Sequence, residues 1–324
     1  MPARKFLASS LELIGNTPLI KLRNVASNTD AEIYVKAEYL NPSGSIKDRI
    51  ALQMILDAES QGKIKRGKTT IVEASTGNTG IALSYVGTML GYKVRIYIPE
   101  GVSRERKEIM EKYGAEVVIM TKQEEQSLKE RSISGGLVEI PGRLKCLEVE
   151  KNEKDTFWIR QFSNPSNSIA HEKTGKEILD ALDSIDGFTA SIGTGGTLLG
   201  ITRTLRKSNA SLKVYAAEPA ATRISLLSQF KQQGKIIRTE VSGGIISDII
   251  EEEIVDKVLK INDQEAVEMA GRLVKEEGLF CGISSGANVY AAIQLAKELG
   301  KGSRIVTVLP DSMDRYLSEQ HYTT

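Results

Sequence analysis

Short strand-like runs alternate with longer helix-like stretches along most of this chain. The strand-like runs are rich in β-branched and aromatic residues and cover residues 33–39, 93–98, 116–120, 213–217 and 304–309. Strands joined by helical connections pair in parallel, because each helix carries the chain back over one face of the sheet. The alternation therefore predicts an α/β fold in which parallel sheets are flanked by helices.

One predicted strand-to-helix junction is rich in glycine. It reads Ser-Ile-Gly-Thr-Gly-Gly-Thr at residues 191–197, between a strand-like run at 188–190 and a helix-like run at 198–205. Glycines let a backbone approach a phosphate closely, and the exposed N–H groups of a helix start favour a dianion by up to about 2 kcal/mol. A tight turn is the alternative, and the spacing does not match the Gly-x-Gly-x-x-Gly dinucleotide motif. The candidate phosphate ligands are Gly193, Thr194, Gly195, Gly196 and Thr197.

Two further junctions place small polar residues before a helix-like run. Ser75, Thr76, Asn78 and Thr79 crowd the junction between residues 70–72 and 81–90, and Ser284 precedes the run 289–299. Such residues commonly cap helices, but capping needs one side chain, whereas the first junction offers four. Convergent N–H and O–H donors can also hold a substrate carboxylate. The first junction therefore favours a carboxylate site, while Ser284 taken alone favours a helix cap.

Lys47 lies at the start of a helix-like stretch, 47–56, within the run Asn-Pro-Ser-Gly-Ser-Ile-Lys-Asp-Arg. A desolvated lysine amine loses its proton more readily and can form a Schiff base with a carbonyl compound. A solvated surface lysine is the simpler interpretation of Lys47 taken alone. A nucleotide-binding P-loop does not fit, since the upstream glycine and the Lys-Ser/Thr pair are missing. Together with the three junctions, Lys47 indicates a site for lysine-bound pyridoxal phosphate.

On these residues the chain resembles the cysteine synthase and cystathionine β-synthase family of fold type II pyridoxal-phosphate enzymes. The resemblance runs nearly from end to end and includes seven motifs in order. They are 14–19 (Ile-Gly-Asn-Thr-Pro-Leu), the run around Lys47, 75–80 (Ser-Thr-Gly-Asn-Thr-Gly), 161–165 (Gln-Phe-Ser-Asn-Pro), 193–197, Ser284 and 310–317 (Pro-Asp-Ser-Met-Asp-Arg-Tyr-Leu). The resemblance implies a two-domain α/β fold like that of the tryptophan synthase β subunit.

The resemblance implies a role for each candidate residue. Lys47 would hold pyridoxal phosphate as a Schiff base and would then remove the substrate Cα proton. Asn78 would bind the phenolic oxygen of the cofactor, Ser284 would face its pyridine nitrogen, and residues 193–197 would hold its phosphate. The residues that would hold the substrate carboxylate are Ser75, Thr76, Thr79 and Gln161.

A serine beside the pyridine nitrogen has a chemical consequence. A neutral hydroxyl cannot keep that nitrogen protonated as an aspartate would, so the ring becomes a weaker electron sink. A long-lived carbanion is then disfavoured, and a leaving group departs from Cβ as the Cα proton is removed. A nucleophile then adds at Cβ, so the predicted reaction is a β-replacement on an activated serine.

The resemblance also supplies a domain division that composition does not reveal. Residues 43–157 would form a smaller, mobile domain, and residues 1–42 together with 158–324 would form the larger cofactor-binding domain. Closure of the smaller domain would exclude water from the reacting groups. Relatives are commonly homodimers, and the resemblance implies the same assembly here.

Departures from the family pattern bear on the substrate. Residues 239–245 read Thr-Glu-Val-Ser-Gly-Gly-Ile in place of Gly-Ile-Gly-Ala-Gly, which leaves sulfide specificity open. Residues 122–154 are densely charged, are broken by 134–136 and Pro141, and predict a different lid. The order Ser-Thr at 75–76 reverses the usual Thr-Ser and keeps both hydroxyls. Arg223 and Arg238 could each bind a substrate phosphate through two bonds, or could be solvated surface residues.

Three β-replacements remain open on the sequence. Cysteine synthesis from sulfide and O-acetylserine or O-phosphoserine leads. Cystathionine formation from serine and homocysteine, or replacement by another amino acid nucleophile, follows. The chain ends soon after Tyr316, which leaves no room for an appended regulatory domain and favours the simpler synthases. A catalytically silent scaffold that binds a partner protein is disfavoured, because Lys47 and residues 193–197 are intact.

Composition limits the class of protein and the kinds of molecule that it can bind. The 324 residues, 40% of them hydrophobic, suggest a compact enzyme of about two domains. The 43 basic and 42 acidic residues give no basic field that would attract nucleic acid or an anionic membrane, so amino acid and sulfide or thiol substrates are expected. Cys146, Cys281, His171 and His321 show no spacing typical of a metal site or a disulfide framework. An apolar signal core and a bilayer-length apolar run are both missing, which predicts a cytoplasmic location.

Overall fold

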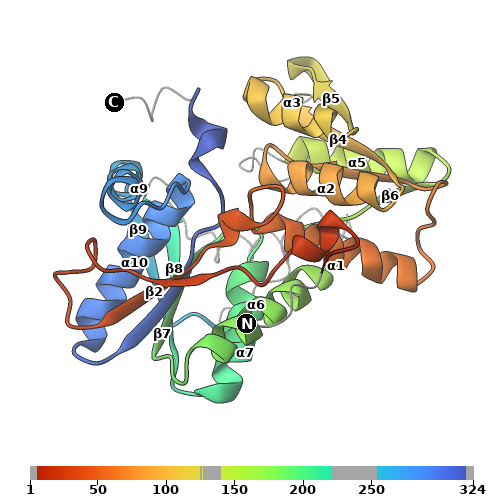
Figure 1. Cartoon of the computed structure of the whole chain (residues 1–324). Coiled ribbons are helices and arrows are strands. Elements are labelled where there is room, and N and C mark those ends of the chain that lie inside the picture. The colour runs from red at the N-terminus through yellow and green to blue at the C-terminus, as the bar shows by residue number, and fades with distance from the viewer. Residues whose placement is uncertain (1–5, 125, 127–139, 221–253, 319–324) are drawn as a thin grey trace.

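The computed structural model describes residues 6–124, 126, 140–220 and 254–318, and within them the chain forms two sheets (Figure 1). The larger sheet has the strand order β1 (Leu19–Lys21), β2 (Glu32–Lys36), β10 (Arg304–Val308), β7 (Gly187–Ser191), β8 (Lys213–Pro219) and β9 (Lys257–Ile261). The smaller sheet has the order β5 (Glu116–Met120), β4 (Lys93–Pro99), β3 (Thr70–Ala74) and β6 (Thr156–Trp158). Every pairing described in these sheets is parallel except that of β1 with β2.

The predicted α/β fold with parallel sheets is confirmed, and most predicted strands match observed ones. Residues 116–120 form β5 at the predicted bounds, and the predictions for β4, β8 and β10 differ from the structure by one or two residues at one end. The prediction is wrong at residues 37–39, because β2 ends at Lys36 and the chain turns into the short 3-10 helix η2 (Glu38–Leu40). This turn buries the carboxylate of Glu38, which accepts hydrogen bonds from Arg49.

Helices connect the strands and pack on both sheets. They are α1 (Lys47–Ser60), α2 (Asn78–Met89), α3 (Arg104–Lys112), α5 (Ile140–Asn152), α6 (Ser166–Ala181), α7 (Gly196–Ser208), α9 (Asp263–Glu277) and α10 (Ile283–Leu299). Helices α6 and α7 approach each other closely at two glycines. A methyl group on Gly175 would lie 2.7 Å from Cβ of Thr204, and one on Gly200 would lie 2.1 Å from the carbonyl oxygen of Ser168. This close packing fixes the start of α7 against α6.

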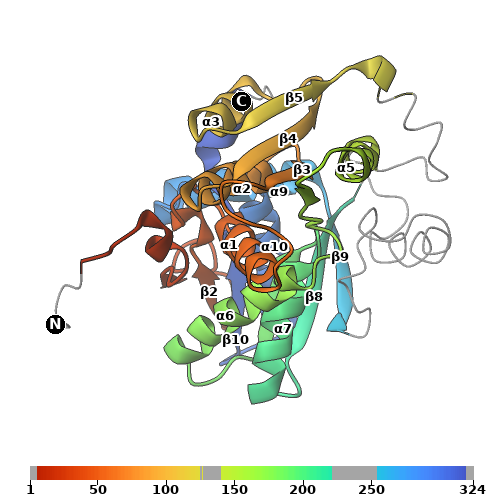
Figure 2. The same cartoon turned by 90° about the vertical axis from the view of Figure 1, so that its right-hand side faces the viewer.

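One apolar core joins the two sheets. Val72 and Trp158 of the smaller sheet share a buried cluster with Phe188 and Val214 of the larger sheet. Each such side chain contributes about 2 kcal/mol through its removal from water. Figure 2 shows the four-stranded sheet at the top and the six-stranded sheet below it. The shared core therefore packs the two sheets against each other.

Helix α5 corrects one expectation for residues 122–154. Pro141 does not break a helix there, because it is the second residue of α5. Proline is tolerated in a first helical turn, where its missing N–H would have no partner inside the helix. Residues 125 and 127–139 lie outside the described residues, so the predicted lid stays a prediction. None of the described helices combines the length and the apolar character needed to cross a membrane.

Candidate active site

Three of the sequence motifs meet just after β10, the last strand of the larger sheet. Asp311 forms an antiparallel bridge with Ser45, two residues before Lys47. Ser312 forms a second antiparallel bridge with Cys281, at the start of the Ser284 motif. These backbone contacts bring together segments that are far apart in the sequence. The segment that follows β10, residues 309–316 (here called the β10 segment), therefore helps to position the Lys47 and Ser284 motifs.

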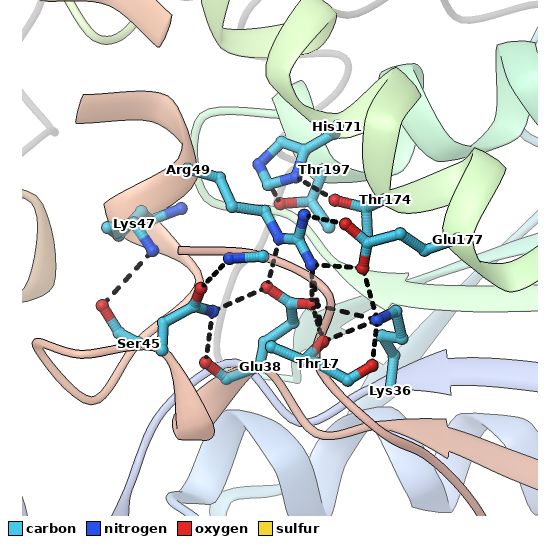
Figure 3. Close-up of polar contacts among 12 residues, drawn as sticks. Thr17, Lys36, Glu38, Ser45, Lys47, Arg49, His171, Thr174, Glu177 and Thr197 are labelled. Atoms are coloured by element: carbon cyan, nitrogen blue, oxygen red, sulfur yellow. Dashed lines mark hydrogen bonds and ion pairs between the residues drawn. The ribbon is translucent and has the colours of Figure 1, made fainter. Parts of the chain in front are cut away.

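Lys47 is the first residue of α1 and is half-buried, so the predicted helix start is confirmed. Its backbone N–H donates to Oγ of Ser45 at 3.3 Å. Figure 3 shows Lys47 together with its neighbours Ser45, Arg49 and His171. The positive end of a helix dipole disfavours a second positive charge, which suits an amine that must act unprotonated.

The glycine-rich junction between β7 and α7 has the donor set of a phosphate site. Helix α7 begins at Gly196. Its N-cap residue, Gly195, has a φ of 86° and, as a glycine, cannot cap the helix with a side chain. Oγ1 of Thr194 accepts a hydrogen bond from Nδ2 of Asn167 at 3.0 Å. A methyl group on Gly196 would lie 1.9 Å from Oδ1 of Asn167, so only glycine fits there. The N–H groups of the helix start and the hydroxyls of Thr194 and Thr197 are suitable donors to an anion.

His171 supports this junction, although the sequence analysis gave it no role and found no metal-site spacing around it. Its Nε2 lies 3.2 Å from Oγ1 of Thr197, and its Nδ1 lies 3.4 Å from Oγ1 of Thr174 (Figure 3). Burial lowers the pKa of His171 well below its ordinary value, and the charges of Lys47 and Arg49 act in the same direction. The imidazole is therefore neutral and can donate at one nitrogen and accept at the other. A lone histidine on a helix that packs inside the molecule is the signal that could have revealed it.

The junction between β3 and α2 contains its own cap. Oγ of Ser75 accepts hydrogen bonds from the backbone N–H of Gly77 at 3.3 Å and of Gly80 at 3.1 Å. One hydroxyl of the polar cluster therefore does the capping that the sequence left open. Thr76 and Asn78 are half-buried beside it. The junction has more polar side chains than its cap requires, as expected of a site that also binds a ligand.

Thr79, in α2, and Gln161, which follows β6, lie side by side although they are 82 residues apart. The hydroxyl of Thr79 donates to Oε1 of Gln161 at 2.6 Å, and Nε2 of Gln161 donates to the carbonyl of Ala74 at 3.2 Å. Beneath them, the buried carboxylate of Glu73 accepts from the backbone N–H of Gln161 at 2.8 Å and from the indole N–H of Trp158 at 2.9 Å. Burial raises the pKa of Glu73, which these donors oppose. Gln161 is thus fixed at three of its polar groups.

Asn78 contacts two residues of the β10 segment that sequence reasoning left without a role. Its Nδ2 donates to Oδ2 of Asp311 at 2.7 Å, and its Oδ1 accepts from Nη1 of Arg315. Tyr316 donates its hydroxyl to the same oxygen of Asp311. Burial raises the pKa of Asp311, while the hydrogen bonds from Tyr316 and Asn78 oppose that shift. Asp311 and Arg315 stand in the motif 310–317, which was the available signal.

Ser284 is half-buried in the first turn of α10. The helix cap that Ser284 alone favoured is not found, because the N-cap of α10 is Gly282 and no side chain caps it. Arg223 and Arg238 lie outside the described residues, as do residues 239–245. The suggestions made for them therefore stay predictions.

A largely buried ion-pair cluster, made of Lys36, Glu38, Arg49 and Glu177, lies to the side of Lys47 (Figure 3). Arg49 binds Glu38 with Nε and Nη2 at 2.7 and 2.8 Å, and binds Glu177 with Nη1 and Nη2 at 2.7 and 2.8 Å. Nζ of Lys36 lies 2.6 Å from Glu177. Burial would raise the pKa of Glu177, but the bonds from Arg49 and Lys36 lower it to about 2. Two cations and two anions balance, which makes a buried charge cluster tolerable.

The residues that meet here fit pyridoxal phosphate. A lysine amine at a helix start can form a Schiff base with its aldehyde, and the start of α7, whose glycine N-cap makes no side-chain cap, offers donors to its phosphate. A model of the pyridoxal-phosphate dependent enzyme family matches residues 11–311. The chain therefore belongs to the pyridoxal-phosphate-dependent enzymes of fold type II.

Sequence relatives place the chain within the cysteine synthase and cystathionine β-synthase family. The chain is 42% identical to the cysteine synthase of Staphylococcus aureus (strain N315) over 327 residues, which cover 99% of each protein. It is 37% identical to a probable cysteine synthase of Bacillus subtilis, over 97% of each. The crystal structure of a cysteine synthase from Entamoeba histolytica matches 100% of this chain and 93% of that one, with a TM-score of 0.84 and 31% identity. The predicted family and fold are thereby confirmed.

Proposed function

We propose that this enzyme catalyses a β-replacement on an activated serine, in which O-acetylserine or O-phosphoserine reacts with sulfide to give L-cysteine. The observation that carries the proposal is the full-length similarity to cysteine synthases combined with Lys47 at the start of α1. Fold likeness alone would not be enough, because one fold hosts several activities. An O-ureido-L-serine synthase also matches, with a TM-score of 0.81 and 32% identity over 97% of this chain and 94% of that one.

In this proposal the residues of the cofactor site divide the work. Pyridoxal phosphate, when bound, supplies an electron sink for negative charge at the substrate Cα. Lys47 would hold it covalently, and Nζ of Lys47 would take the proton from the substrate Cα. The start of α7, residues 193–197, would bind its phosphate. Ser284 would face its pyridine nitrogen, and Asn78 would donate to its phenolic oxygen.

The junction at the start of α2 holds the substrate carboxylate. Thr79 donates to Oε1 of Gln161, which orients the Gln161 amide so that its Nε2 faces away from Thr79. One hydrogen of Nε2 goes to the carbonyl of Ala74, and the second is oriented to bind a carboxylate oxygen. The hydroxyls of Ser75 and Thr76 complete the set. A carboxylate bound between N–H and O–H donors fixes the Cα proton against Lys47.

The same proposal includes the assembly and the division of the chain. Residues 43–157 move as a smaller domain against residues 1–42 and 158–324, and closure excludes water from the site. The enzyme works as a homodimer in the cytoplasm. Trp158 is the one tryptophan of the chain and lies at the boundary, so its fluorescence on addition of the donor amino acid reports the motion. Light scattering reports the mass of the assembly.

The decisive experiment is a matrix of donors and nucleophiles assayed with the protein saturated with pyridoxal phosphate. The donors are serine, O-acetylserine and O-phosphoserine, and the nucleophiles are sulfide, homocysteine and an amino acid amine. We expect the highest kcat/KM for sulfide with one of the two activated donors. Lys47→Ala should lower that kcat/KM by at least about 1,000-fold, because both covalent attachment and proton removal are lost.

Other outcomes separate the alternatives. A higher kcat/KM with homocysteine would replace cysteine synthesis by cystathionine synthesis, and product with an amine nucleophile would favour the third reaction. The absence of product from every pair would contradict a β-replacement. For the donor, Arg223→Ala and Arg238→Ala should raise the KM for O-phosphoserine alone, and an unchanged KM in both variants would remove the phosphate contact.

A further inference from the structure

Asn78 is an amide, and an amide can present either its oxygen or its nitrogen to a ligand. The two orientations differ by a rotation of the side-chain end, and they have opposite hydrogen-bonding character. An acceptor on the ligand, such as a phenolic oxygen, is served only when Nδ2 faces it. The usefulness of Asn78 therefore depends on what fixes its orientation.

Two charged residues of opposite sign flank the Asn78 amide. Oδ2 of Asp311 accepts from Nδ2 at 2.7 Å, and the guanidinium of Arg315 donates to Oδ1. Arginine has donors only, and Oδ2 of Asp311 already accepts from Tyr316. Rotating the amide would set its oxygen against Asp311 and its NH2 group against the guanidinium. Both contacts would become repulsive, so the flanking charges allow a single orientation.

Two glycines leave room for the side chains of Asp311 and Arg315. A methyl group on Gly282 would lie 2.3 Å from Oδ1 of Asp311, and one on Gly44 would lie 2.7 Å from Nη2 of Arg315. Gly44 also has a φ of 81°, a conformation that other residues rarely adopt. Arg315 donates in addition to the carbonyl of Ser43. Arg315 therefore packs against the backbone of the motif that contains Lys47, and Asp311 packs against the backbone of the motif that contains Ser284.

We propose that Asp311 and Arg315 are positioning residues that lock the Asn78 amide with one Nδ2 hydrogen committed to Asp311 and the other presented to the cofactor. This inference rests on the role proposed above for Asn78. Neither charged residue has to touch the cofactor, because each acts through the amide. Their buried side chains, 1% and 3% exposed as residues, hold that orientation without competition from water.

The test is a double-mutant cycle on cofactor affinity, measured by titrating the cofactor-free protein with pyridoxal phosphate. Asp311→Asn should raise the Kd about tenfold, because an asparagine can present either face and lets Asn78 rotate. In the Asn78→Ala background the same substitution should change the Kd less than twofold. The visible spectrum of the bound cofactor should shift in the same direction in Asp311→Asn and Asn78→Ala, with no further shift in the double variant.

Asp314→Asn is the matched control, since Asp314 is exposed in the 3-10 helix η4 (Met313–Tyr316), which contains Arg315, and should leave Kd and spectrum unchanged. Equal losses from Asp311→Asn in both backgrounds would overturn the positioning role. An Asn78→Ala variant with normal Kd and spectrum would instead overturn the role of Asn78 itself. If Asp311→Asn does not fold, Arg315→Met carries the same cycle and the same criterion.

Discussion

The starts of α2 and α7 share one arrangement, in which a strand leads through a glycine N-cap into a helix, but different kinds of side chains hold them in place. Each follows a parallel strand, each has a glycine N-cap, and neither N-cap residue makes a side-chain cap. The α7 start is supported through Asn167 and the neutral His171. The α2 start is supported through the charged pair Asp311 and Arg315, which hold Asn78.

Under the proposed function, the difference follows from what each helix start would bind. A phosphate dianion brings its own charge, so a junction that binds it needs N–H donors and neutral hydroxyls that do not compete for it. An amide that binds a single ligand atom can present either its oxygen or its nitrogen to that atom. Flanking charges are therefore needed to fix the orientation of the amide. Neutral support suits an anion site, and charged support suits an orientation site.

The largest effect should come from disturbing the α7 start sterically. Gly196→Ala places a methyl group 1.9 Å from Oδ1 of Asn167, so the junction must shift. We expect the Kd for pyridoxal phosphate to rise about 100-fold. The free energy of unfolding of the cofactor-free protein should fall by about 3 kcal/mol, which lowers its melting temperature by several degrees. Gly193→Ala meets no atom within 4 Å and should leave the cofactor-free melting temperature unchanged. Equal melting temperatures for both variants would contradict the close packing.

At the α2 start, a substitution of Thr79 should affect the substrate rather than the cofactor. Thr79→Val keeps the shape but removes the hydroxyl that donates to Gln161. Since Gln161 then loses its fixed orientation, we expect the KM for the donor amino acid to rise about 30-fold, or about 2 kcal/mol, while the Kd for pyridoxal phosphate stays within about twofold. Thr88→Val, exposed near the other end of α2, is the control. A larger effect on the cofactor than on the donor would contradict the role proposed for Thr79 and Gln161 at the substrate carboxylate.

The opposite pattern should follow from His171. His171→Leu removes the imidazole that contacts Thr197, so the hydroxyl loses its orientation toward the phosphate. We expect the Kd for pyridoxal phosphate to rise about tenfold, with the KM for the donor nearly constant. His171→Asn can restore one of the two hydrogen bonds and should recover part of the affinity. Identical affinities for the Leu and Asn variants would mean that His171 acts only by filling space.

The smallest effect concerns the ion-pair cluster, which supports neither junction directly. The folded pKa of Glu177 is about 2, below its ordinary value, so the stability it contributes is present above about pH 4.5 and is lost as the pH falls toward 2. Between pH 5.5 and 3.5, wild type should lose about 1 kcal/mol of unfolding free energy more than Glu177→Gln does. Urea unfolding at both pH values measures this. Glu172→Gln, on the same helix, should behave as wild type, and a wild-type slope in Glu177→Gln would contradict the assignment.

The sequence was informative wherever the signal was local. The helix start at Lys47, the strands around residues 93–120 and the junction 193–197 each depend on neighbours a few residues away, and the structure has them as predicted. The support of Asn78 was not predictable in this way, because Asp311 lies 233 residues further along the chain. The same holds for Arg49 and Glu177, which are 128 residues apart. Local patterns reveal turns and periodicity, whereas pairing of distant charges depends on the finished topology.

The place of β10 has a consequence for the order in which the protein is made. β10 is the last strand of the larger sheet in sequence, yet it lies between β2 and β7. A ribosome therefore releases β2 and β7 long before they can be joined, and each has an open edge until residues 304–308 emerge. Asp311 and Arg315 emerge later still. Assembly of the cofactor site is thus among the final events of synthesis, and a chain that stalls before β10 would leave two unpaired strand edges for chaperones to protect.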